Sequence, residues 1–229
     1  MIPVKQKIII VSLGGSIIVP PGGIDARFLK NFKNLILKYA KKGWRFIIVV
    51  GGGATCRQYQ AAAKSVSRVR PEELDWLGIA ATRLNAELLK AIFGHSARAL
   101  ANPSKKVVCK EPILIGAGVK PGRSTDYAAV LAAQKYDASF LVNLSNIDFV
   151  YDYDPRKYKN AKKIKHIKWP DFKKLVGGSW VPGAHLPFDP IASKLAQRSG
   201  LKVIIMNGRK LKEFEKLLRA KPFKGTIIE

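Results

Sequence analysis

Four apolar segments of this 229-residue chain each end in small or polar residues. These endings are Gly14-Gly15-Ser16, Gly51-Gly52-Gly53, Gly116-Ala117-Gly118 and Ser145-Asn146. Glycine lets a backbone approach a phosphate group closely, and the helix that follows offers free N–H groups and the positive end of its dipole. A single loop of this kind is often required by turn geometry alone. Several at one sheet edge favour one long phosphorylated ligand, or two that face each other.

The phosphate-binding motifs with the best-known spacing are absent. The chain contains neither G-x-x-x-x-G-K-[ST] nor G-x-G-x-x-G. Phosphoryl transfer on another architecture would still need cations that spread the developing charge and carboxylates that orient them or hold Mg²⁺. Charged side chains of both kinds occur near the loops: Arg57, Asp126, Asp148, Asp154, Asp189 and Lys194.

The elements that must position these side chains alternate between strand and helix. Residues 7–13 and 45–50 are β-branched runs typical of buried parallel strands, and the helix between them begins after Asp25, a good N-cap residue. Periodicity predicts further helices over 54–66, 72–93, 127–135, 191–199 and 211–218, and strands over 105–110, 112–115, 140–144, 202–206 and 225–228. This order predicts an α/β fold, a three-layer α/β/α sandwich with a mainly parallel sheet. We expect one domain, 1–229, with lobes of about 1–139 and 140–229.

Charge is the most unusual feature of the composition. Lys and Arg total 41 against 16 Asp and Glu, giving a formal net charge of +25, while 47% of the residues are hydrophobic. That apolar fraction argues against disorder, and no segment has the length of a membrane span. Two cysteines are too few for a disulfide framework, and the three histidines, His95, His166 and His185, lack metal-ligand spacing. A cytoplasmic location is therefore expected, and no residue is assigned as a protein ligand of a metal.

A strongly basic chain is a candidate for nucleic-acid binding. The stretch 156–174 holds nine Lys and Arg residues and one Asp. It is either a solvated face or a surface that attracts nucleotides or RNA. Aromatic RNA-binding motifs and a regular basic helix are missing, so nucleic acid is a possible but not a favoured partner.

Six motifs in order resemble the amino acid kinase superfamily, and within it the archaeal uridylate (UMP) kinases. They are 12-SLGGS-16, 49-VVGGG-53 with Arg57, 75-DWLGIAATRLNA-86, 121-PGRSTD-126, 146-NIDFVYDYDP-155 and 189-DPIASK-194. The resemblance spans nearly the whole chain. The glycine motifs are shared by the whole superfamily, whereas the segment 75–86 and the loop 121–126 are specific to the uridylate branch. It implies transfer of the ATP γ-phosphate to UMP with Mg²⁺, an acceptor-side lobe near 1–139 and an ATP-side lobe near 140–229.

The resemblance also implies roles for individual residues. Asp126, Lys194, Asp189 and Arg57 would be catalytic: Asp126 organises the cations, Lys194 neutralises the transferred group, and Asp189 orients Lys194 or carries Mg²⁺ through water. ATP would contact Gly15, Ser16, Gly53, Arg57, Ser145, Asn146, Tyr151 and Asp154. UMP would contact Gly52, Asp75, Val119, Lys120, Pro121, Gly122, Arg123, Ser124 and Thr125. ATP and UMP are the implied partners, together with further copies of the chain in a hexamer.

Three departures from the family pattern, and several alternatives, stay open. Ser12 stands where many members have Lys, Phe149 where the family has Gly, and Arg123 where it has His. The last two bear on nucleotide preference. Asp75, Arg57 and Lys194 are also compatible with ordinary exposed positions, and Asp126 with a helix N-cap. Other family acceptors (acetylglutamate, carbamate, isopentenyl phosphate, another nucleoside monophosphate) and a non-catalytic nucleotide- or RNA-binding relative remain alternatives.

Overall fold

The computed structural model describes residues 7–155, 157–177 and 186–229. Its centre is an eight-stranded sheet with the order β3-β4-β2-β1-β5-β9-β10-β8, in which every neighbouring pair is parallel except β9 and β10. The strands are β1 (Ile8–Leu13), β2 (Arg45–Val50), β3 (Ala97–Ala99), β4 (Ile113–Gly116), β5 (Phe140–Ser145), β8 (His166–Ile167), β9 (Lys202–Asn207) and β10 (Thr226–Ile228). A separate antiparallel pair joins β6 (Val150–Tyr151) to β7 (Lys163–Ile164).

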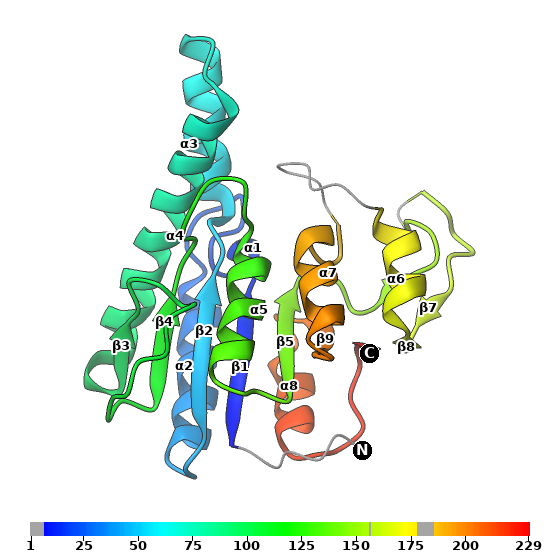
Figure 1. The fold of residues 1–229 in the computed structure, drawn as a ribbon. Helices are drawn as coiled ribbons and strands as arrows, with labels where there is room; N and C mark the ends of the chain where they lie inside the picture. Colours follow the sequence, from blue (N-terminus) through cyan, green and yellow to red (C-terminus); the bar gives the residue numbers. More distant parts are fainter. Residues whose placement is uncertain (1–6, 156, 178–185) are drawn as a thin grey trace.

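Helices cover both faces of this sheet (Figure 1). They are α1 (Gly15–Ile18), α2 (Ala26–Ala40), α3 (Gly53–Val66), α4 (Pro71–Phe93), α5 (Thr125–Lys135), α6 (Trp169–Val176), α7 (Pro190–Arg198) and α8 (Leu211–Leu218), with a 3-10 turn at Gly94–Ser96. Successive β1 side chains face opposite cores, since Ile9 and Val11 pack with α2, α4 and α8 whereas Ile10 packs with α5, α6 and α7. The predicted three-layer α/β/α sandwich is confirmed.

Helix α2 shows why the local predictions succeed. Its apolar residues recur at helical spacing, and the carboxylate of Asp25 accepts a hydrogen bond from the N–H of Phe28 at 2.8 Å. That bond satisfies one of the donors left open at a helix start. The predicted N-cap and the predicted burial of this face are both confirmed.

The strand predicted over 105–110 is wrong. Those residues form an irregular segment, and β3 lies earlier, at Ala97–Ala99, where it pairs with β4. The valines at 107 and 108 suggest a strand, and Val107 and Cys109 do pack against the core. Val108, however, is 93% exposed, and β4 already pairs with β2 and β3, so the segment has no free strand edge beside β4.

The lysine-rich stretch 156–174 holds more structure than its composition predicts. β7 and β8 lie within it, and α6 begins in it and buries Trp169, Phe172 and Val176 against the sheet. The lysines lie between these buried apolar residues, so a count of charged residues does not reveal the apolar pattern. The predicted loop with Pro182-Gly183, together with His185 and Arg156, lies outside the described residues.

Candidate active site

The loops after β1, β2 and β5 meet at one edge of the sheet. Leu13 at the end of β1 is in register with Val50 on one side and Leu144 on the other. The strand order reverses at this point, because β2 follows on one side of β1 and β5 on the other. In open parallel sheets, ligands bind beyond the carboxyl ends of the strands at such a reversal. The geometry therefore brings the predicted phosphate loops together where a ligand site is expected.

The first two glycine loops touch each other through their backbones. A Cβ atom on Gly15 would lie 2.1 Å from the backbone nitrogen of Gly53, and one on Gly51 would lie 2.5 Å from the nitrogen of Gly15. Gly53 also has a positive φ of 65°, which disfavours any side chain there. These glycines are thus required by packing, and that packing places the start of α1 directly against the start of α3.

One face of α4 holds two of the loops by hydrogen bonds to their backbones. Asn85, 3% exposed, donates to the carbonyls of Gly51 at 2.8 Å and Gly52 at 3.2 Å. Thr82 accepts from the N–H of Gly118 at 2.9 Å, and Asp75 accepts from the N–H of Gly122 at 2.8 Å. Spacings of seven and ten residues place these three side chains along one side of a helix.

Asp75 is therefore not an ordinary surface carboxylate. It is half-buried, and one of its oxygens anchors the loop 119–125, to which the family resemblance assigns the uridine side. In that loop Arg123 is exposed, and its guanidinium lies 5.1 Å from the ring centroid of Tyr127. Ser124, not Asp126, is the N-cap of α5, because its hydroxyl accepts from the N–H of Tyr127. The alternative reading of Asp126 as an N-cap is wrong, and its carboxyl group has other partners.

Asp126 lies at the strand reversal, bonded to both strands that flank it. Its Oδ1 accepts from the hydroxyl of Ser12 on β1 at 2.7 Å and from the amide of Asn143 on β5 at 3.3 Å. Burial of the carboxyl group raises the pKa of Asp126 to about 6, and the negative charge of Asp189 acts in the same direction against the hydrogen bond from Ser12. A carboxyl group with a raised pKa at a strand reversal is a typical functional-site feature.

Asp189 joins this cluster from α7. Its N–H donates to Oδ2 of Asp126 at 3.3 Å, while its own Oδ1 caps α7 by accepting from the N–H groups of Ile191 and Ala192. Asp189 is 6% exposed, and its Oδ2 is buried without a hydrogen-bond partner among the described residues. A buried carboxylate oxygen left without a partner costs free energy unless a cation or donor reaches it.

This cluster fits a cation of the kind that phosphoryl transfer requires. Two carboxylates meet there, and oxygen is the ligand type that Mg²⁺ prefers, whether directly or through its waters. An ammonium group would satisfy the same oxygen. Among the described residues no group of three His, Cys, Asp or Glu forms a protein-only metal cage.

The remaining predicted site residues lie on the same loops and helices, with less buried side chains. Arg57 is exposed one turn into α3, and Lys194 is exposed on α7, five residues after Asp189. Ser145 ends β5, Asn146 is exposed after it, and Tyr151 and Asp154 are half-buried at and after β6. The structure places them around the edge without assigning a ligand to any of them.

Two side chains in the segment after β5 have structural partners. Asp148 accepts from Lys210 at 2.6 Å and from Asn207 at 2.9 Å, and the Lys210 bond holds the pKa of Asp148 below its usual range. It therefore fixes the loop after β5 to the end of β9 and is not a catalytic candidate. Phe149 is buried, with the ammonium of Lys163 5.6 Å from its ring centroid.

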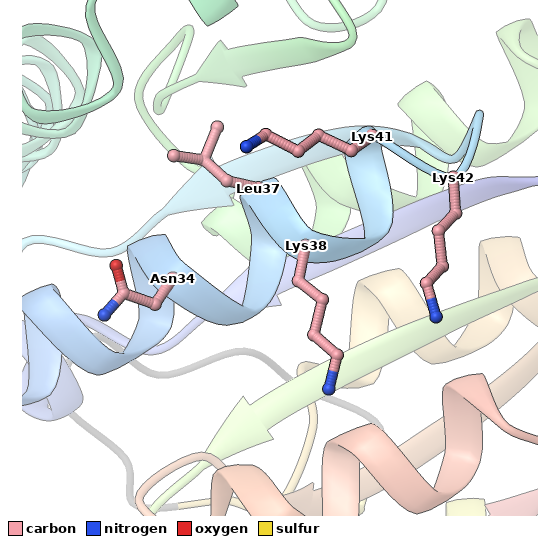
Figure 2. A pocket seen from close by; sticks show the side chains of 5 residues that line it. All are labelled: Asn34, Leu37, Lys38, Lys41 and Lys42. Carbon is pink, nitrogen blue, oxygen red and sulfur yellow. The ribbon is translucent and has the colours of Figure 1, made fainter.

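Three other features of the described residues are poorer candidates for an active site than this sheet edge. Cys56 is half-buried between α3 and α4, and burial raises the pKa of its thiol, which disfavours a reactive thiolate. Two surface hollows of about 500 and 680 Å³ lie along α2 and between α2 and α8 (Figure 2 shows the first) and include none of the predicted site residues. No described helix has the length and apolar character needed to span a bilayer.

Three polar residues that contact the site were given no role from the sequence, although each leaves a signal in it. Asn143 is the one polar residue inside the apolar run 140–144, and it contacts Asp126. Thr82 and Asn85 lie in the segment 75–86, in which the sequence analysis assigns a role to Asp75 alone. A helix position that is both polar and buried is the general sign of such a residue.

The chain belongs to the amino acid kinase family, whose model matches residues 7–207. Among its relatives are a uridylate kinase of Methanospirillum hungatei, 33% identical over 96% of this chain and 94% of the relative, and one of Thermoplasma volcanium, 34% identical over 96% and 97%. The crystal structure of uridylate kinase from Archaeoglobus fulgidus has a TM-score of 0.83 at 27% identity and covers 98% of this chain and 100% of that one. A UMP kinase from Bacillus anthracis, 20% identical with a TM-score of 0.79, shows the same fold. The predicted family and its uridylate branch are confirmed.

Proposed function

We propose that this chain is an ATP-dependent UMP kinase that transfers the γ-phosphate of ATP to UMP, giving UDP and ADP. The observation that supports it most is the Asp126–Asp189 pair at the strand reversal, beside two glycine loops in backbone contact. The relatives named above carry the same activity in their names over nearly the full length of the chain.

In this proposal the acceptor lies on the side of α4. Gly52 binds the UMP phosphate, the free oxygen of Asp75 binds the ribose hydroxyls, and residues 119–125 enclose the uridine. Because Asp75 already anchors Gly122, one side chain links the loop to the sugar. The attacking UMP phosphate is anionic, so no general base is needed, and positioning supplies most of the rate.

ATP lies on the other side of the gap. Gly15, Ser16 and Gly53 bind its phosphates, and Ser145, Asn146, Tyr151 and Asp154 surround the adenosine. Arg57 and Lys194 carry positive charge to the transferred group, where charge develops in the transition state. Asp126 and Asp189 hold the cations in place. When bound, Mg²⁺ would neutralise phosphate charge, and the unpartnered oxygen of Asp189 is the group that fits it or its waters.

The family resemblance completes the proposal with a cytoplasmic enzyme that forms a homo-oligomer, a hexamer. Neither point enters the catalytic argument.

The test is turnover over an acceptor panel. ADP release is measured with ATP·Mg²⁺ and UMP, CMP, dTMP, acetylglutamate, carbamate or isopentenyl phosphate. We expect turnover with UMP well above all others. Asp75→Ala should raise KM for UMP about 10- to 100-fold with little change in KM for ATP, since it loses hydrogen bonds to the acceptor alone. Glu72→Ala, an exposed carboxylate in the same turn, is the matched control. Turnover with another acceptor and none with UMP would refute the proposal.

A further inference from the structure

The loop between β6 and β7 carries positive charge that the rest of the structure does not neutralise. Residues 157–168, which run from this loop through β7 and β8, contain six lysines and no acidic residue, and the loop's own carboxylates, Asp152 and Asp154, precede them. Lys157, Lys159, Lys162 and Lys165 are exposed and form no ion pair with any described residue. Exposed, unpaired cations so close in sequence repel one another, and a polyanion would relieve that repulsion.

Two exposed tyrosines lie in the same loop. Tyr153 is 64% and Tyr158 53% exposed, and their ring centroids are 5.5 Å apart with planes inclined at 53°. Elsewhere in the described structure the aromatic pairs belong to the buried cores. Exposed aromatic rings beside lysines are the combination that binds single-stranded nucleic acid, because bases stack on the rings while cations follow the backbone.

Hydrogen bonds hold the loop in shape without using these groups. One oxygen of Asp152 accepts from the N–H groups of Tyr153 at 2.9 Å and Lys162 at 2.7 Å, which closes the base of the loop. The N–H groups of Lys157 and Tyr158 both donate to the carbonyl of Asp154. A loop ordered before binding loses less entropy when it binds.

A second basic surface differs from this loop in its ion pairs and in its lack of aromatic side chains. The hollow between α2 and α8 is lined by Lys38, Arg209, Lys210, Lys212 and Lys224, but three of these pair with Glu215, Asp25 and Asp148. Among the residues that line it there is no aromatic side chain. Charge there serves the fold, whereas the lysines of the β6–β7 loop have no such partner.

We propose that the β6–β7 loop binds single-stranded RNA, with Tyr153 and Tyr158 stacking on bases and Lys157, Lys159 and Lys162 contacting phosphates. The side chains used differ from those assigned to ATP and UMP, although Tyr151 and Asp154, which are assigned to ATP, flank Tyr153 at the start of the same loop. RNA binding assigns a function to part of the +25 charge that phosphoryl transfer leaves unused.

The experiment measures binding of a fluorescein-labelled, unstructured 20-nucleotide RNA to the full-length protein by fluorescence anisotropy over a range of KCl concentrations. Lys157→Gln/Lys159→Gln/Lys162→Gln should reduce the slope of log affinity against log salt by about 2, since each phosphate contact on a single strand contributes about 0.7. Tyr153→Ala/Tyr158→Ala should weaken RNA binding about tenfold or more and leave the slope unchanged. Binding of inorganic polyphosphate, which has no bases, should be insensitive to the tyrosine change.

The matched control is Lys41→Gln/Lys42→Gln/Lys212→Gln, which removes the same charge from the surface along α2 and α8. It should bind RNA nearly as the unmodified protein does, and thermal unfolding checks that every variant is folded. Equal losses in both lysine variants, or full affinity in the tyrosine variant, would each overturn the proposal. So would binding to phosphatidylserine vesicles with none to RNA.

Discussion

On the side of the sheet edge that we assign to the acceptor, α4 holds the loops mainly through uncharged side chains, with Asp75 as the one carboxylate among these contacts, whereas on the side that we assign to the ATP donor carboxylates hold the loops. Thr82 and Asn85 bond to Gly118, Gly51 and Gly52, all inside the protein. Asp189 instead caps α7, Asp148 fixes the loop after β5, and Asp126 joins the two sides. The contacts made by Thr82 and Asn85 should therefore be insensitive to pH, while the junction and the donor side should respond to it.

The largest expected effect comes from the junction. Asp126→Asn keeps the shape of the side chain but removes the charge that would organise cations, so kcat should fall about 1,000-fold or more. Steady-state kinetics with ATP and UMP measure this, and far-UV circular dichroism should stay unchanged.

Asp171→Asn, an exposed carboxylate paired with Lys174, provides the control and should leave kcat unchanged. If Asp126→Asn retains near-normal turnover, Asp126 is not catalytic and the contrast between the two sides loses its functional meaning.

The same residue predicts how stability changes with pH. The folded protein holds the Asp126 proton up to about pH 6, whereas the unfolded chain releases it near pH 4. Between these values the folded state binds more protons, so this group makes stability fall as pH rises, by at most about 3 kcal/mol. Asp126→Asn lacks this contribution and should be more stable than the unmodified protein at pH 7.5, with the difference shrinking toward pH 4.

Urea unfolding of both proteins at pH 4.5 and 7.5 gives the comparison. Half-buried carboxylates with lowered pKa values, such as Glu213 and Glu215, act in the opposite direction but are common to both proteins and cancel. A stability difference that is independent of pH would show that Asp126 titrates normally.

On the acceptor side the expected loss is smaller and independent of pH. Asn85→Ala removes a donor from the buried carbonyl of Gly51 and one of the two donors to the carbonyl of Gly52, so it should lower the free energy of unfolding by about 2 kcal/mol, with a higher KM for UMP. Urea unfolding and UMP kinetics are the measurements.

Glu87→Ala, on the exposed face of the same helix, should leave both quantities unchanged. If the stability loss of the Asn85 variant varies between pH 4.5 and 7.5, the contacts of Asn85 are not insensitive to pH and the contrast between the two sides is wrong.

Local features of the site are predicted from the sequence, whereas contacts between distant elements are not. β-branched runs ended by glycine specify β1, β2 and their loops, because burial and turn geometry are local properties. The roles of Asn85 and Asn143 depend on which elements become neighbours, and single polar residues in apolar patterns do not disclose their partners. The strand predicted over 105–110 fails because β2 and β3 already pair with both edges of β4, so local strand propensity there finds no partner strand.

The smallest expected effect concerns Ser12, which stands where many family members carry Lys. Its hydroxyl donates to Oδ1 of Asp126 and lowers the pKa of that carboxyl group. Ser12→Ala removes the bond, so the acid limb of the kcat profile should move to higher pH while kcat at pH 8 changes less than about fivefold. Because the change acts through protonation of Asp126, the activity lost at pH 6 should return as pH rises. A loss of equal size at every pH would instead mean that Ser12 contacts the substrate, and the donor-side response to pH would then have another origin.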